Sequence, residues 1–527
     1  MRAPRARLTA ALLSACAIGI VSSCLLPRTM TRPATPASSA SRASRASRAS
    51  RAEYHNPVLP GFYPDPSICR VGDDYYLVTS SFEYFPGVPI FHSKDLVHWR
   101  QIGHCLTRDS QLPLAQAKSS QGIFAPTIRH HDGTFYVVTT NISGGDNFYV
   151  TASDPAGEWS EPKWLHEASG WMDPSLFFDD DGKVYYTRHG GGEHGGVYQA
   201  ELDVQSGTLK SEARLIWKGT GGIWPEGPHL YKVGRYYYLL ISEGGTSYGH
   251  MLTIARATEP FGPFEPYAGN PILTHRDHRS LPIQATGHAD LLQAANGSWW
   301  AVFLGVRPWD GHHHHLGRET FLAPVRWNED NWPVVNDGAP VAETMSAAGL
   351  PEPSAIEEPP ARDDFAASTL RFDYNFIRNP NRADASLTSR PGFLRLVGTN
   401  VSLDDIGSPA FVGRRQRHYR CKVSTLIEFE PVSEGQEAGL AVRANEHNHY
   451  ELTIAGENGR RRVRLHTKIA DVSRIVAEAD VPAGPIVLTV RATESRYDFF
   501  WSVDRGPERA LGSAPTTPLS SEAAGGF

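Results

Sequence analysis

Cysteine is scarce in this chain: its 527 residues include five, of which Cys16 and Cys24 fall in an apolar N-terminal segment. The remaining three, Cys69, Cys105 and Cys421, form an odd and widely spaced set. Such a set cannot build a disulfide framework, and no two of its members have the spacing of metal ligands. We therefore expect three side chains that behave as small apolar core residues.

Long apolar runs are also missing, apart from LTAALLSACAIGIVSS near the N-terminus, which is too short and poorly flanked for a stable membrane span. Arg2, Arg5 and Arg7 precede this run, as in an export signal, so we expect a signal peptide over residues 1–28. The segment VSSC resembles a bacterial lipobox, in which Cys24 would be lipidated; ordinary cleavage is the alternative. The protein is thus expected to be exported, as an extracellular, periplasmic or membrane-anchored lipoprotein.

Positive charge is in deficit beyond the N-terminus. Residues 1–52 contain nine Arg and neither Asp nor Glu, so the formal charge of −6 becomes −15 for the rest of the chain. Nucleic-acid affinity comes largely from Lys and Arg on phosphates, so we expect no nucleic-acid partner and a neutral substrate. Residues 29–52, with four SRA copies and no apolar periodicity, are typical of a disordered tether.

Long helical periodicity is absent, and short aromatic strands recur in its place. One phrase appears five times, as YPDPSICRVGDDYYLVTS, FAPTIRHHDGTFYVVTT, MDPSLFFDDDGKVYYTR, PEGPHLYKVGRYYYLLIS and GHADLLQAANGSWWAVFL. Turn signals such as Asp132-Gly133 lie inside the copies. A repeat of roughly 50 residues indicates a radial architecture, because one unit cannot bury its own face. The pattern predicts a five-bladed β-propeller over residues 53–337.

A change of composition follows the repeats. Residues 338–361 are rich in Pro, Ala and Glu, as a linker is. Residues 362–527 then alternate apolar and polar side chains, which predicts a two-sheet β-sandwich. The final segment LSSEAAGGF adds no closing strand, so we expect the sandwich to be incomplete at its C-terminus. The fold class expected for the whole chain is all-β.

Three repeats place a carboxylate at one early position, namely Asp65, Asp173 and Glu226, while the other two place Pro126 and His288 near it. Equivalent positions in a ring of repeats converge on one mouth. The apolar and aromatic neighbours of Glu226 should raise its pKa, as a general acid requires, whereas Asp65 should have freer access to water and stay ionised. Two carboxylates in different surroundings are what glycosidic bond hydrolysis requires.

The segments NPVLPGFYPDPSI, DPSLFFDDDGK, EGPHLY, TGHADL and LGRETFLAPV resemble glycoside hydrolase family 43, which contains β-xylosidases and α-L-arabinofuranosidases on a five-bladed propeller. The C-terminal region resembles the sandwich of the xylosidase-like branch of that family. The resemblance implies an inverting reaction with Asp65 as general base, Glu226 as general acid and Asp173 as the residue that orients the acid and tunes its pKa.

The resemblance also implies binding residues. Arg318 matches an arginine that binds sugar hydroxyls, and Phe82 and Phe124 match aromatic positions of the sugar pocket. His288 is expected to contact the substrate, with a role as ligand of a Ca²⁺ ion at the propeller axis as the alternative. The run His312 to His315 is expected at the rim of the site, where the sandwich would also add an aromatic residue.

The function expected from these features is the release of terminal β-1,4-xylosyl or α-L-arabinofuranosyl residues from hemicellulose oligosaccharides by an exo-acting enzyme that requires no cofactor. Two alternatives stay open: a carbohydrate-binding propeller without catalysis, and an arabinofuranosidase with little xylosidase activity. A fructan hydrolase of the same shape is disfavoured, because its Asn-Asp-Pro motif near the first strand is absent.

Overall fold

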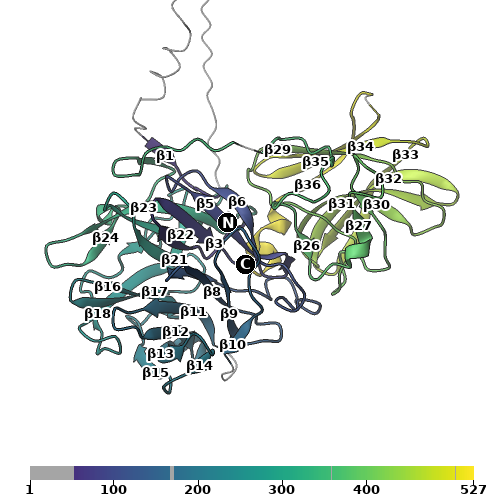
Figure 1. Ribbon diagram of the computed structural model, residues 1–527. Helices are drawn as coiled ribbons and strands as arrows, with labels where there is room; N and C mark the ends of the chain where they lie inside the picture. Colours follow the sequence, from purple (N-terminus) through teal and green to yellow (C-terminus); the bar gives the residue numbers. More distant parts are fainter. Residues whose placement is uncertain (1–52, 166–170, 358, 505) are drawn as a thin grey trace, which may run out of the picture. The chain divides into compact units, whose positions relative to one another are not determined.

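A computed structural model describes residues 53–165, 171–357, 359–504 and 506–527 (Figure 1). The expected signal peptide, the lipidation site at Cys24 and the tether of residues 29–52 lie outside the described residues. In the described ranges, no helix has the length and apolarity needed to cross a membrane. The α-helical content of these ranges is one turn, α2 (Ser521–Ala524), so the expected all-β class is confirmed.

Five antiparallel sheets of four or five strands follow one another along the chain (Figure 1). Their strands are β2 (Ser67–Val71), β3 (Asp74–Val78), β5 (Gly87–Ser93) and β6 (Arg100–Leu106) in the first; β7 (Thr127–His131), β8 (Thr134–Thr140), β9 (Asn147–Ala152) and β10 (Lys163–Leu165) in the second; β11 (Met172–Phe178), β12 (Val184–Gly190), β13 (Gly196–Asp203), β14 (Thr208–Leu209) and β15 (Arg214–Trp217) in the third; β16 (Glu226–Val233), β17 (Tyr236–Glu243), β18 (Met251–Ala257), β19 (Glu265–Pro266) and β20 (Leu273–Thr274) in the fourth; and β21 (Gln284–Gln293), β22 (Trp299–Val306), β23 (Glu319–Trp327) and β24 (Pro333–Val335) in the fifth.

The first strands of these sheets form a closed ring. β2 contacts β7, β7 contacts β11, β11 contacts β16, β16 contacts β21, and β21 returns to β2. Short turns make the tight hairpins possible: Asp132 and Gly133 join β7 to β8 with φ values of 47° and 74°, the pair of positive angles that a type I′ turn needs. The five expected repeats are therefore the five blades of a propeller.

The ring is fastened by an early strand and a late one. β1 (Glu53–His55) pairs antiparallel with β25 (Thr344–Ser346), which lies inside the segment expected to be a linker. The buried Asn56 side chain donates a hydrogen bond to the backbone oxygen of Leu322 in the fifth blade. The start of the propeller is thus held against its last blade.

Asp290 joins the blades at the centre of the ring. Its carboxylate accepts hydrogen bonds from Ser67 at 2.6 Å, from Arg129 at 2.8 Å and from Tyr231 at 2.6 Å, and these residues belong to the first, second and fourth blades. Burial acts to raise the pKa of Asp290, but the nearby guanidinium of Arg129 and the other donors hold it below the ordinary value. A fully buried charge is tolerated here because it is paired and hydrogen-bonded.

The C-terminal region contains two four-stranded antiparallel sheets around a shared apolar cluster. One sheet has the order β29 (Cys421–Ile427), β34 (Ile486–Ala492), β35 (Arg496–Val503), β36 (Arg509–Pro515); the other has β30 (Glu437–Asn445), β31 (Asn448–Glu457), β32 (Arg460–Ile469), β33 (Val472–Asp480). This is the expected sandwich; its expected incompleteness stays a prediction. Short pairs precede it: β26 (Phe376–Ile377) with β4 (Tyr84–Phe85), and β27 (Ala385–Ser386) with β28 (Arg395–Leu396). The 3₁₀ turns are η1 (Gly192–His194), η2 (Asn336–Gly338), η3 (Arg382–Asp384) and η4 (Thr517–Leu519).

Buried ionic groups connect the sandwich with the loop after the first blade. Glu446 accepts a hydrogen bond from the backbone of Ser119 at 3.0 Å and forms an ion pair with Arg378. Arg443 lies 3.6 Å from Glu446 and 3.5 Å from Glu83 of the propeller. All four charged side chains are 5% exposed or less, so two arginines and two glutamates neutralise one another away from water.

The three cysteines outside the N-terminal segment are free thiols. Cys69 and Cys105 are buried, as expected, whereas Cys421 is half-buried at the edge of the sandwich core.

Candidate active site

Two of the three predicted catalytic residues, together with His288, lie where the first strand of a blade is irregular. The pairing of β11 shifts between Met172 and Ser175, that of β16 between Glu226 and His229, and that of β21 on both sides of Gly287. A β-bulge redirects the side chains beside it, and bulges are frequent next to active sites. In this propeller the bulges recur at equivalent positions of three blades, so they turn Asp173, Glu226 and His288 out of the regular alternation.

Several of these residues have a left-handed backbone. Asp65 has a φ of 55°, Asp173 of 53°, His288 of 49° and Phe82 of 49°. Residues other than glycine seldom adopt such angles, which cost free energy and cluster at functional sites. The fold therefore holds these four side chains in conformations that the chain would not choose by itself.

Asp65 lies just before β2 and is 4% exposed. Its Oδ1 accepts a hydrogen bond from Arg318 at 2.8 Å, and its Oδ2 accepts one from the Ser80 hydroxyl at 2.5 Å. The expectation that Asp65 has freer access to water than Glu226 is wrong, since the Glu226 side chain is the more exposed of the two at 13% against 5%. A guanidinium and a hydroxyl, rather than solvent, satisfy the Asp65 carboxylate.

The other two carboxyl groups are electrostatically linked to Asp65. Burial raises the pKa of Glu226 well above its ordinary value, and the negative charges of Asp173 and Asp65 act in the same direction. Burial also raises the pKa of Asp173, whose Oδ2 accepts a hydrogen bond from the backbone of Gly227 at 3.1 Å. The pKa direction expected for Glu226 is confirmed, and the structure brings all three carboxyl groups together.

Arg318 is 6% exposed, and its Nη1 donates to both Asp65 and the Thr246 hydroxyl, at 2.8 Å and 3.0 Å. Its buried Nε has no hydrogen-bond partner among the described residues. The guanidinium also lies over the rings of Phe82 and Phe527, 5.5 Å and 4.8 Å from their centroids. Arg318 is therefore a buried residue, and one of its donors has no partner among the described residues.

Aromatic rings enclose this region. Phe82 contacts Phe62, Phe124 and Phe527 at centroid distances of 5.4, 5.6 and 5.6 Å. Phe124 is half-buried and lies 5.7 Å from Phe527. Phe527 comes from the segment after the sandwich, so the expected aromatic contribution from that region is present. Phe62 was not predicted, because a phenylalanine beside a proline-rich turn has no distinguishing pattern.

His288 and Pro126 complete the set of equivalent positions. The His288 backbone donates to the Ser242 hydroxyl at 2.6 Å, and its Nδ1 lies 3.8 Å from Asp65. Pro126 is buried just before β7. The sequence did not predict Ser80, Ser242 or Thr246 as site residues, because a single hydroxyl side chain belongs to no recognisable motif.

The histidine run reaches the C-terminal helix. His314 Nδ1 is 2.7 Å from Glu522 Oε1, and Tyr248 donates to the same carboxylate at 3.2 Å. His315 packs edge-on against Tyr419 and Tyr497 of the sandwich region. The run therefore acts as a contact between the propeller and α2, the helix that precedes Phe527.

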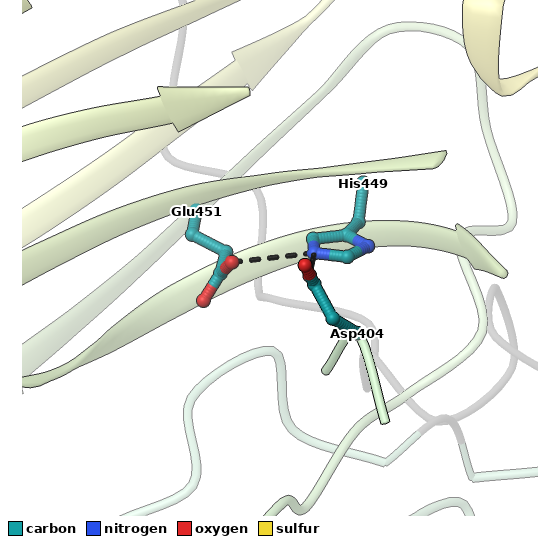
Figure 2. Close-up of side chains that lie close together, drawn as sticks. All are labelled: Asp404, His449 and Glu451. Carbon is teal, nitrogen blue, oxygen red and sulfur yellow. Dashed lines mark ion pairs between the residues drawn. The ribbon is translucent and has the colours of Figure 1, made fainter. Parts of the chain in front are cut away.

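In the part of the chain that the structure describes, one group of side chains has the spacing of metal ligands, and it lies in the sandwich (Figure 2). His449 Nε2 is 3.0 Å from Asp404 Oδ1 and 3.3 Å from Glu451 Oε1. Lys468 is 2.8 Å from the second oxygen of Asp404, and His466 is 3.2 Å from Glu451. Lys468 and His466 of the protein itself already contact the two carboxylates, so we interpret the group as a polar network within the protein.

Comparison with known proteins agrees with this geometry. Residues 54–333 match Glycosyl hydrolases family 43, and residues 362–527 match the Beta xylosidase C-terminal Concanavalin A-like domain. A non-reducing end alpha-L-arabinofuranosidase of Bacteroides ovatus is 46% identical over 479 residues, 90% of this chain and 89% of the relative. A xylosidase/arabinosidase of Butyrivibrio fibrisolvens is 43% identical over 489 residues, 90% of this chain and 93% of the relative.

The solved structures give the same result. The crystal structure of a xylan beta-1,4-xylosidase from Bacillus halodurans superposes with a TM-score of 0.83 at 36% identity, covering 89% of this chain and 93% of that one. Fold, matched family and relatives agree over both domains: the chain belongs to glycosyl hydrolase family 43 and is a glycoside hydrolase.

Proposed function

We propose that the protein removes terminal pentoses, β-1,4-xylosyl or α-L-arabinofuranosyl, from the non-reducing ends of hemicellulose oligosaccharides with inversion at the anomeric carbon. The observation that carries the proposal is the meeting of three carboxyl groups with different partners, Asp65 beside a guanidinium and Asp173 and Glu226 with raised pKa values. Inverting hydrolysis needs one carboxylate that is charged and one carboxylic acid that is protonated at the same pH.

In this proposal Asp65 is the general base, which removes a proton from the attacking water. Glu226 is the general acid, which protonates the leaving oxygen, and its raised pKa supports a protonated form near neutral pH. Asp173 orients the acid through the backbone of the adjacent Gly227 and raises the pKa of Glu226 by its charge. No covalent bond forms between sugar and enzyme.

The proposed pocket for the terminal sugar is bordered by Arg318 and the phenylalanine cluster, which contact each other. The unpartnered Nε of Arg318 supports a hydrogen bond to a sugar hydroxyl, since a buried donor without an acceptor is costly. The half-buried Phe124 and the exposed Phe527 supply apolar surface for the face of a pentose, and the buried Phe82 packs against both rings. His288, next to Asp65, is proposed as a further substrate contact.

The names of the relatives support activity on both xylosyl and arabinofuranosyl residues. One is named an arabinofuranosidase, one a xylosidase/arabinosidase and one a xylan beta-1,4-xylosidase. We propose dual activity, with an arabinofuranosidase of low xylosidase activity as the second candidate. Relative rates on xylobiose and on an arabinofuranosylated xylo-oligosaccharide separate these two.

The test of the acid is Glu226→Ala, matched with Glu265→Ala, a change of an exposed carboxylate in the same sheet. We expect kcat on xylobiose or its arabinosylated equivalent to fall roughly 10²–10⁴-fold for Glu226→Ala and to stay near wild type for Glu265→Ala. NMR of the first product should show the inverted anomer. Hydrolysis by Glu226→Ala at the wild-type rate, or a retained anomer, would contradict the proposed roles.

We further propose that no metal ion is required. We also propose that the protein is exported, either anchored to a membrane through lipidated Cys24 or released after ordinary cleavage of the signal peptide. The pairing of Asp290 with Arg129 supports the first point, because a guanidinium already supplies positive charge at the propeller axis. A Ca²⁺ ion beside His288 is the alternative, and it predicts loss of activity in chelator. Cell fractionation of wild type and Cys24→Ser distinguishes an anchored form from a released one.

A further inference from the structure

One buried histidine beside the proposed acid has an unused nitrogen. His250, immediately before β18, is fully buried. Its Nδ1 is 3.2 Å from the backbone oxygen of Ala285. A carbonyl oxygen only accepts hydrogen bonds, so Nδ1 carries the hydrogen and Nε2 is left with a lone pair. The tautomer of this ring is thus fixed by the backbone.

The free nitrogen faces the active site. Nε2 of His250 has no hydrogen-bond partner among the residues that the structure describes, and it lies 3.9 Å from Oε1 of Glu226. An unpaired buried acceptor is costly, and native proteins seldom retain one without a reason. The carboxyl group of Glu226, in its acid form, has a proton to donate and lies beside this nitrogen.

A second histidine in the same blade shows what an ordinary partner looks like. His275 is equally buried, and its Nδ1 is 2.8 Å from the backbone oxygen of Ile283. Its Nε2 accepts a hydrogen bond from the backbone of Val341 at 2.9 Å. The two rings share burial and tautomer and differ in one respect: the acceptor of His275 is satisfied by the fold, and that of His250 is not.

The neighbouring blade makes room for this arrangement. A Cβ atom placed on Gly287 would lie 2.3 Å from Cε1 and 2.5 Å from Nε2 of His250. Any side chain at position 287 would therefore displace the ring from Glu226. The glycine precedes His288, so the same irregular strand positions one proposed substrate contact and leaves space for His250.

We propose that His250 is a positioning residue for the proposed general acid: its Nε2 accepts a hydrogen bond from the protonated carboxyl group of Glu226 and keeps the proton there until the leaving oxygen arrives. The inference rests on the proposed role of Glu226. The 3.9 Å separation exceeds a hydrogen bond, so the Glu226 side chain must turn toward the ring to form it. The carboxyl group carries one proton: when the leaving oxygen arrives, the O–H turns from Nε2 to that oxygen, and the same proton is transferred to it.

The charges around the pair agree with a neutral imidazole. Burial lowers the pKa of His250 to about 3, and the positive charges of His288 and Arg318 act in the same direction. Asp65 acts against them, and together with Asp173 it disfavours ionised Glu226. The ring therefore remains an acceptor, and the acid remains the donor.

The leaving group supplies the test. An aryl glycoside with a strongly acidic phenol needs no proton, whereas xylobiose does. For His250→Leu we expect kcat/KM on xylobiose to fall about 10–100-fold, and kcat/KM on the dinitrophenyl glycoside of the same sugar to stay within about threefold of wild type. The alkaline limb of the xylobiose profile should move to lower pH by about one unit, because a bond to the neutral acid is lost.

His275→Leu is the matched control, since it removes an equally buried ring whose Nε2 is hydrogen-bonded to Val341 and not to Glu226. It should lower kcat/KM on both substrates by the same factor, or on neither. The assays of both variants are carried out in the presence of a chelator. An equal loss on both substrates for His250→Leu, or an unmoved alkaline limb, would overturn the proposal. Glu226→Ala measured on the same pair separates the two ideas: if it shows no dependence on the leaving group, the proposed acid itself is wrong.

Discussion

At the scale of single residues, the active site depends on partners far away in the chain. Asp65 is joined to Arg318 across 253 positions, and the fully buried Asp290 is joined to Ser67 across 223. Each carboxylate is stable only because the folded ring supplies its donors. The cost of removing one such residue is therefore set by the charge that it leaves behind.

Asp290→Ala should lower the free energy of unfolding by about 3–5 kcal/mol, because the largely buried Arg129 would lose its counterion. Chemical denaturation of the purified variant measures this loss. Asp337→Ala is the control, since it breaks a largely exposed pair with Arg326 and should cost less than about 1 kcal/mol. Equal losses of unfolding free energy for the two variants would show that Asp290 contributes no more to stability than an exposed ion pair does.

Residues at equivalent positions of the repeats could be predicted from the sequence. The burial and hydrogen-bond partners of single side chains could not, because residues from other blades determine them. Asp173 and Glu226 could be found because the repeats align them. Asp179 lies in an aspartate-rich turn, where solvated side chains are usual, yet it is 6% exposed and bonds to Lys232 and Tyr237 of the next blade. Contacts between blades have no periodic signal, so the bond from Arg318 to Asp65 could not be predicted, although Arg318 itself was expected in the site.

At the scale of elements, the short helix α2 connects the histidine run with the aromatic pocket. Glu522 binds His314 and Tyr248 of the propeller, and Phe527 follows within one turn. A helix of four residues has little stability of its own, so its place depends on these contacts. The strands, by contrast, were predictable from alternation and turn residues alone.

Glu522→Gln should weaken this attachment and raise KM more than it lowers kcat, because Phe527 would be held less firmly. Burial acts to raise the pKa of Glu522, but the hydrogen bond and charge of His314 lower it from 4.5 to about 2. A lowered carboxyl pKa stabilises the fold above pH 4.5 and loses that effect as the pH falls toward 2. The difference in Tm between wild type and variant should therefore shrink over that range; a constant difference would contradict the ion pair.

At the scale of the whole molecule, propeller and sandwich act as one structure. The buried network of Glu83, Arg378, Arg443 and Glu446 lies between them, beside the Ser119–Ser120 backbone. The two domains were predictable from composition and pattern, but this connection was not, because arginine and glutamate usually indicate surface. The network also holds the loop whose Ser120 hydroxyl accepts the backbone hydrogen of Phe527 at 3.0 Å.

Glu446→Ala should cost about 3–5 kcal/mol, since two arginines would lose a buried partner. Calorimetry should show the unfolding transition separate into two, and activity should fall with the loss of the Ser119 contact. Glu494→Ala, which removes a half-buried partner of the exposed Arg420, is the control and should leave a single transition. A single unchanged transition for Glu446→Ala would mean that other contacts suffice to join the domains.

The pairing of β1 with β25 has a consequence for the order in which the molecule is made. β1 occupies residues 53–55 and its partner residues 344–346, so nearly the whole propeller must be synthesised before the first strand finds its place. Blades can form one after another during translation, but β1 has no partner until Thr344 has left the ribosome. Until then the chain begins with an unpaired strand, which is fixed only after the fifth blade has been made.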